Sequence, residues 1–143
     1  MADTGIVSSQ YELYLFFGVG DFGKGACKQI QIWERNDTNY FPLAVNLSAV
    51  QFEHKHLFST LERLFDKYQI NPNHLAIEIT ESTAMHHIDA SIRSFERLRQ
   101  MGIKLAIDDF GTGHSSFLYL KNLPVDELKI DREFIRDLSV GSK

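Results

Sequence analysis

The chain has 143 residues, which is the length of one ordinary globular domain. Hydrophobic residues make up 43% of it and charged residues 24%, a composition that excludes intrinsic disorder as a description of the whole chain. The formal net charge is −4, so there is no domain-wide basic field to hold duplex DNA or an anionic membrane. We therefore expect no DNA partner.

Cysteine usage and the apolar runs indicate a cytoplasmic protein. Cys27 is the only cysteine, which leaves neither an internal disulfide nor a Cys/His zinc site. A reducing compartment is the expected setting, with Cys27 as a small hydrophobic side chain on its helix. The longest early apolar run, residues 13–20, is far shorter than the roughly 20 residues that span a bilayer, and no basic leader precedes it. We expect no membrane span in this chain.

Hydrophobic periodicity predicts an alternating series of helices and strands. In chain order the expected elements are a helix from Ala26 to the polar stretch at 36–39, a strand at 43–47, a helix at 57–68, a strand at 75–79, a helix at 88–98, a strand at 103–107, a short helix at 116–121, a strand at 127–130 and a final helix from about Arg132. Gly102 is expected to cap the helix at 88–98. Strict alternation predicts an α/β fold of parallel strands joined by right-handed crossovers.

Three of the predicted strands share a tripeptide pattern, in which a small alanine lies two residues before a polar residue. The triplets are Ala44-Val-Asn46, Ala76-Ile-Glu78 and Ala106-Ile-Asp108. Because side chains alternate along a strand, the alanine and the polar residue of each triplet face the same side. Lys129 takes the comparable place on the fourth strand. Parallel α/β folds bind ligands at the carboxyl ends of their strands, so the pattern predicts a site with these residues in register.

The polar residues at this edge are oxygen donors. They are Asn46, Glu78, Asp108 and Asp109, a set that suits Mg²⁺ or Mn²⁺ better than zinc or copper. Asp108 and Asp109 point to opposite faces if the strand continues, but a turn at Asp109 would let the pair bridge two ions, the usual arrangement for phosphodiester hydrolysis. Lys129 would orient or deprotonate a water or neutralise phosphate charge. The alternative is that the carboxylates only cap helices, which fits three residues in register less well.

Two other patterns are more ambiguous. Gly111-Thr-Gly113 precedes the predicted short helix, where its amides could hold a phosphate or simply form a tight turn. His86 and His87 look like a ligand pair, but neighbouring residues on a helix diverge, so a solvated pair is expected instead.

The motifs together resemble the EAL domain family, bacterial phosphodiesterases that open cyclic di-GMP to linear pGpG. The motifs that carry the resemblance occur in order and are Val45–Ala49, Glu78–Ser82, Asp108–Gly113 and Leu128–Asp131, within a match from about Ala26 to Leu138. The resemblance implies a TIM-like barrel in which Asn46, Glu78 and Asp108 bind one Mg²⁺ or Mn²⁺ and Asp109 a second. It implies that Lys129 assists the hydrolytic water. It also marks Gly111, Thr112 and Asp131 as candidates for substrate binding.

The resemblance is partial. The Glu-Ala-Leu strand that names the family, with its metal-binding glutamate and a nearby substrate-contacting arginine, is absent, and residues 1–25 form an atypical N-terminal segment whose glycines disfavour a helix. A closed barrel needs about 250 residues. We therefore expect residues 26–143 to be a partial EAL domain with about four parallel strands, catalytically incomplete. The alternative is a non-catalytic module that binds cyclic di-GMP or a protein partner.

A phosphorylation receiver domain also combines an acidic pair with a strand lysine. Its acidic pair lies early in the chain, whereas Asp108 and Asp109 follow two predicted strands, and the EAL motifs would have no explanation. We therefore expect a cyclic di-GMP ligand rather than phosphotransfer.

Four strands of an eight-stranded barrel would leave two open edges and an alanine layer facing water. Such edges offer unpaired backbone groups to other chains, so a homo-oligomer is expected. The segment 8–24, with its aromatic run at Tyr14–Phe17, could instead cover one side.

Overall fold

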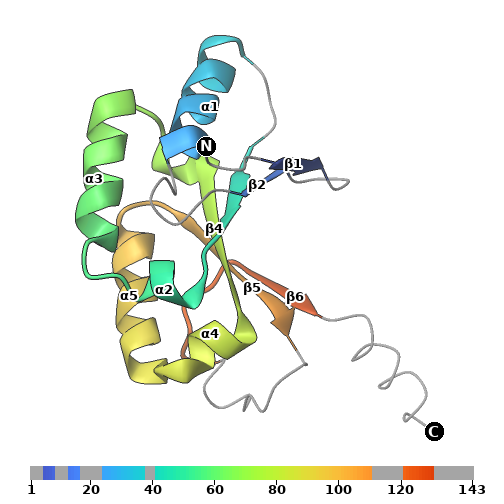
Figure 1. Cartoon of the computed structure of the whole chain (residues 1–143), viewed down its shortest axis with the longest axis vertical. Coiled ribbons are helices and arrows are strands. Elements are labelled where there is room, and N and C mark those ends of the chain that lie inside the picture. The colour runs from blue at the N-terminus through green and yellow to red at the C-terminus, as the bar shows by residue number, and fades with distance from the viewer. Residues whose placement is uncertain (1–4, 9–12, 17–23, 38–40, 111–120, 131–143) are drawn as a thin grey trace, which may run out of the picture.

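The structure is a computed structural model that describes residues 5–8, 13–16, 24–37, 41–110 and 121–130 (Figure 1). These residues form one sheet in which the strands follow the order of the sequence. The strands are β1 (Gly5–Ser8), β2 (Leu13–Phe16), β3 (Leu43–Asn46), β4 (Leu75–Thr80), β5 (Lys104–Phe110) and β6 (Glu127–Ile130). The longer helices α1 (Lys24–Arg35), α3 (Leu57–Tyr68) and α5 (Ile88–Gln100) gather on one face of the sheet (Figure 1).

The predicted α/β fold is confirmed. The four expected strands are β3 to β6, and each pairs with the next in parallel. The largest difference is in β5, which continues to Phe110, three residues beyond the predicted end at Ile107. The expected helix at 116–121 lies outside the described residues except for Lys121, and the helix expected from Arg132 lies outside them entirely. Within the described part of the chain, no helix is long and apolar enough to cross a membrane.

Two further strands precede the predicted ones. β1 and β2 form an antiparallel pair, and β2 pairs in parallel with β3, with Leu13 opposite Leu43. The aromatic run, whose covering of one side was the alternative to a homo-oligomer, therefore contributes residues to a strand along β3. One of the two edges that the sequence suggested would be open is occupied in this way.

The long helices are amphipathic and end within two residues of the predicted positions. α1 buries Ala26, Cys27 and Ile30, and burial raises the pKa of the Cys27 thiol to about 12. α5 is followed by Gly102 at φ +92°, a backbone conformation that disfavours other residues. A Cβ atom at Gly102 would lie 3.2 Å from Pro72 Cβ, so space as well as conformation selects glycine here.

Short helices follow the carboxyl ends of two strands and were missed by periodicity. α2 (Ala49–Phe52) follows β3, and a capping box joins Ser48 and Gln51 at its start. α4 (Glu81–His86) follows β4 and is capped by the Thr80 side chain, which accepts a hydrogen bond from Thr83 N. A 3-10 turn, η2 (Pro72–His74), leads into β4. Helices of four and six residues are too short to produce a clear 3.6-residue pattern.

The two faces of the sheet differ in side-chain size. The larger apolar residues pack with the helices in one core cluster that includes Leu43, Val45, Leu75, Ile77, Ile79, Leu105 and Ile107. The alternating positions carry the alanines of the three triplets. The expectation that these alanines face water is wrong, because Ala44, Ala76 and Ala106 are only 1%, 7% and 3% exposed.

Candidate metal centre

Asn46 and Glu78 lie side by side at the carboxyl ends of β3 and β4. They are register partners in the parallel ladder, as the two triplets predict. Glu78 is 1% exposed and Asn46 is half-buried. One residue further, Leu47 N donates a hydrogen bond to the Glu78 carbonyl at 3.0 Å, so the backbone after β3 stays paired with β4. An amide oxygen and a carboxylate are thus placed on neighbouring strands.

Asp108 does not lie in register with Glu78, which corrects the prediction. Glu78 pairs with Ala106, and Asp108 pairs with Thr80, two residues further along β4. A displacement of two residues is about 6.6 Å along a strand and leaves Asp108 on the same face as Glu78. Strands of a tilted, barrel-like sheet are staggered in this way, and equal spacing between motifs does not reveal the stagger.

A β-bulge brings Asp108 and Asp109 opposite a single residue of β6. Ile107 pairs with Leu128 and Phe110 with Ile130, so two aspartates face the one intervening position, Lys129. Asp109 has φ +54°, and its amide donates a hydrogen bond to Asp108 Oδ1 at 2.9 Å. The sequence suggested a turn at Asp109. The strand continues instead, and the bulge changes the side-chain alternation there.

Lys129 reaches across β5 to Glu78. Its Nζ donates a hydrogen bond to Glu78 Oε2 at 3.1 Å, although β5 separates the two strands that carry these residues. Ala106 is the β5 partner of Glu78, and its small side chain leaves space for this contact. The carboxylate is buried and the lysine side chain is 21% exposed, so the ammonium offsets a negative charge that would otherwise be costly to bury.

A cavity of about 290 Å³ adjoins the site, and Ala76, Glu78 and Ala106 are among the residues that line it. Glu127 also lines the cavity and is the β6 partner of Ala106, so it shares the face of Glu78. Sequence reasoning did not single out Glu127. The sequence does place Glu127 two residues before Lys129 on a predicted strand, which puts both side chains on the same face of the sheet.

The chemistry of the donor set suits a hard divalent cation, but the structure does not bring oxygens of Glu78, Asp108 and Asp109 within 4.8 Å of one another. One amide oxygen and three carboxylates lie at the carboxyl ends of three successive parallel strands, without sulfur or imidazole among them. Lys129 already contacts one Glu78 oxygen. The candidate substrate contacts Gly111, Thr112 and Asp131 lie outside the described residues.

Comparison with known proteins identifies relatives. The chain is 48% identical over 117 residues to the bifunctional diguanylate cyclase/cyclic di-GMP phosphodiesterase MucR of Pseudomonas aeruginosa, covering 82% of this chain and 17% of that protein. It is 36% identical over 118 residues to the cyclic di-GMP phosphodiesterase NbdA of the same species, covering 82% of this chain and 15% of NbdA. The chain therefore spans less than a fifth of the length of these curated relatives.

Solved structures give the same result. The structure matches the phosphodiesterase PaMucR in complex with c-di-GMP with a TM-score of 0.78 and 36% identity, over 92% of this chain and 64% of that chain. It matches the EAL domain of Mycobacterium smegmatis DcpA with a TM-score of 0.72 and 31% identity, over 93% of this chain and 62% of that chain. The sequence profile of the EAL domain matches residues 24–143. The resemblance in the sequence motifs is thus confirmed, and the chain belongs to the EAL domain family.

Proposed function

We propose that this chain carries the strand-end metal site of a cyclic di-GMP phosphodiesterase. The observation that supports this most is the buried Glu78 carboxylate, which lies beside Asn46 in the ladder and contacts Lys129. Asn46, Glu78 and Asp108 would hold one Mg²⁺ or Mn²⁺, and Asp109 would serve a second. When bound, such ions activate water and stabilise charge on a phosphodiester.

The protein's own groups would position the reactants around these ions. Lys129 would hold the hydrolytic water or phosphate oxygen through the ammonium protons that do not face Glu78. The buried Glu78 would fix the ammonium in place. Gly111, Thr112 and Asp131 would contact the dinucleotide. A bacterial cytoplasm is the proposed setting, because the named relatives are bacterial proteins that act on cyclic di-GMP.

We further propose that these 143 residues alone turn over cyclic di-GMP very slowly. The glutamate and the arginine that the resemblance assigns to the Glu-Ala-Leu strand are not among them. Charge that develops in the transition state needs a complete, preorganised set of donors. The second candidate function is a module that binds cyclic di-GMP or a protein partner without hydrolysis. The lack of this glutamate and arginine among the 143 residues supports it as well.

The first prediction separates the two candidates. The purified chain is incubated with cyclic di-GMP and Mg²⁺ or Mn²⁺, and pGpG is measured by chromatography. The wild-type chain is expected to form pGpG no faster than its own Lys129→Ala variant, which serves as the inactive reference. A chimera in which residues 24–143 replace the matched segment of MucR is expected to form pGpG and to lose that activity on Glu78→Gln. Lys28→Met, at an exposed position on α1, serves as the control and should leave the chimera active. If the folded chimera forms pGpG at the same rate with and without Glu78→Gln, the proposed site is wrong.

The second prediction concerns metal binding by the isolated chain. Glu78→Ala and Asp108→Ala are each expected to weaken Mn²⁺ affinity by about tenfold or more, since each removes a proposed ligand. Calorimetric titration measures the change, and Glu62→Ala on the exposed face of α3 is the matched control. Unchanged affinity in both site variants would exclude these residues as ligands.

The third prediction is self-association. β6 is the terminal strand of the sheet in the part of the chain that the structure describes, and terminal strands pair readily with other chains. We propose a homo-oligomer and expect light scattering to give a mass above that of the monomer at several concentrations. A monomer mass throughout, together with cooperative melting, would contradict it.

A further inference from the structure

Glu53, His86 and His87 form a cluster of side chains away from the strand-end site. Glu53 is the residue after α2, which follows β3, and the two histidines lie at the end of α4, which follows β4. Because β3 and β4 are neighbours in the sheet, the short helices after them bring the three residues together. The cluster thus arises from the topology, although 33 residues separate Glu53 from His86.

The chain geometry explains why both histidines face the same carboxylate. On a continuous helix, side chains of adjacent residues diverge, and on that ground the sequence favoured a solvated pair. α4 ends at His86, and His87 has φ −138° and ψ 79°, which is not helical. His86 Nδ1 lies 3.0 Å and His87 Nδ1 3.2 Å from the same Glu53 oxygen, Oε1. Both rings are exposed to solvent, as predicted, but both also contact Glu53.

These distances are close to those between ligands of one metal ion. Donor atoms about 2.1 Å from a tetrahedral ion lie roughly 3.4 Å from one another. One ligand atom from each of the three residues lies within 4.8 Å of the others, so small side-chain rotations suffice to place all three around an ion. All three side chains are on the surface, where such rotations meet little resistance.

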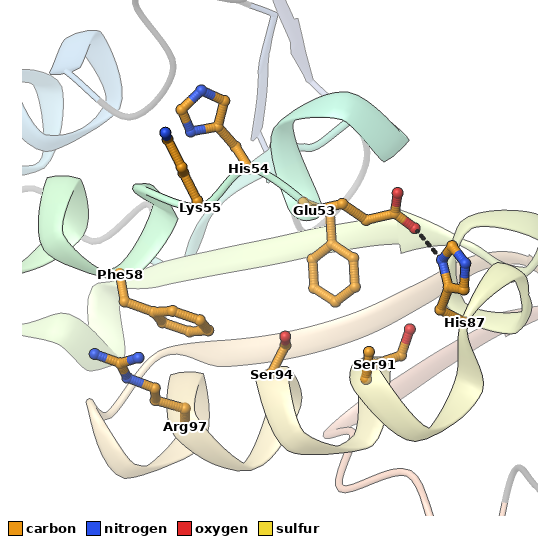
Figure 2. A pocket seen from close by; sticks show the side chains of 10 residues that line it. Glu53, His54, Lys55, Phe58, His87, Ser91, Ser94 and Arg97 are labelled. Atoms are coloured by element: carbon orange, nitrogen blue, oxygen red, sulfur yellow. Dashed lines mark hydrogen bonds and ion pairs between the residues drawn. The ribbon is translucent and has the colours of Figure 1, made fainter.

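The chemistry of the cluster selects a different metal from the strand-end site. Two imidazoles and a carboxylate suit zinc and similar first-row ions, whereas Mg²⁺ prefers oxygen donors. Glu53 and His87 also border a cavity of about 510 Å³, which leaves room for a water as fourth ligand (Figure 2).

We propose that Glu53, His86 and His87 bind one Zn²⁺ ion. The ion would join the end of α2 to the junction between α4 and α5. It would replace two shared hydrogen bonds by three coordinate bonds, with water completing the coordination. This site is independent of the proposed phosphodiesterase function, because it shares no residue with Asn46, Glu78, Asp108 or Asp109.

The test uses the full, untagged chain and the metal alone. Zn²⁺ affinity is measured by competition with a chromophoric chelator, and Co²⁺ is added in parallel because its visible absorption reports tetrahedral coordination. Glu53→Gln, His86→Ala and His87→Ala are each expected to weaken Zn²⁺ binding by about tenfold or more. The matched control is His54→Ala, which removes an exposed histidine one residue from Glu53. Asp108→Ala is measured as well, to show whether the Zn²⁺ ion lies at the strand ends instead.

Several outcomes would overturn the proposal. One is equal Zn²⁺ affinity in the wild-type chain and in a folded His86→Ala/His87→Ala double variant. Another is a loss of Zn²⁺ binding on Asp108→Ala instead, which would place the ion at the strand ends. A third is wild-type binding too weak to compete with the chelator. Circular dichroism of each variant ensures that a change in affinity is not a loss of fold.

Discussion

Replacing Lys129 with methionine is expected to lower the free energy of unfolding by about 3 kcal/mol in metal-free buffer. The substitution keeps an apolar stem of similar length but removes the ammonium that lies 3.1 Å from Glu78 Oε2. The Glu78 side chain is 1% exposed, so the substitution leaves a buried carboxylate without the ammonium that offsets its charge. Urea denaturation followed by circular dichroism measures the loss.

The reciprocal variant should cost less. Glu78→Gln leaves the charge on Lys129, but that side chain is 21% exposed and can turn its ammonium to solvent. Lys28→Met, on the exposed face of α1, is the matched control and should change stability by no more than about 0.5 kcal/mol. Similar losses in Lys129→Met and Lys28→Met would mean that the ion pair contributes nothing.

Divalent cations extend this prediction to the proposed metal site. Millimolar Mg²⁺ is expected to restore part of the stability of Lys129→Met, because an ion bound by Glu78 would supply the missing positive charge. The same addition should affect Lys28→Met no more than the wild type. If Mg²⁺ raises the stability of all three proteins equally, its effect does not arise at Glu78.

Sequence reasoning predicted β3 to β6, but not β1 and β2, and it predicted the edge of the sheet that carries the polar residues. Short apolar runs bounded by turn residues are strong local signals, and Asn46, Glu78 and Asp108 each follow such a run. The period-two alternation then placed each polar residue on the face of its alanine. The motifs around these residues were specific enough to indicate the family, since several of them occur in order.

The details of the site depend on long-range pairing, which local patterns do not encode. The pairing of Glu78 with Ala106, rather than with Asp108, follows from the stagger between β4 and β5. The bulge at Asp109 depends on β6 as well as β5, and the ion pair of Glu78 with Lys129 crosses an intervening strand. The shared contact of both histidines with Glu53 depends on the end of α4 at His86. Each of these features forms between elements that are distant in the sequence, so no local pattern predicts it.

The core that supports both proposed metal sites should be most sensitive at Phe95. This residue of α5 is fully buried, and its ring centroid lies 5.4 Å from that of Phe52 in α2. Phe95→Ala is expected to lower the free energy of unfolding by about 4 kcal/mol, because it removes a large buried ring and leaves a cavity between α5 and α2. Since domains of this kind are stable by only about 5–15 kcal/mol, the melting temperature should fall sharply.

Two comparisons separate packing from a general effect of substitution. Phe95→Leu retains much of the buried volume and should cost about 1–2 kcal/mol. Ile32→Ala removes apolar atoms at a position that is 41% exposed on α1, where the better helix propensity of alanine offsets the small loss of burial. Urea midpoints should therefore rank Ile32→Ala nearest the wild type, then Phe95→Leu, then Phe95→Ala. Equal midpoints for the two Phe95 variants would show that the Phe95 cavity is not the cause of the loss, and that α2 is held against α5 by other contacts.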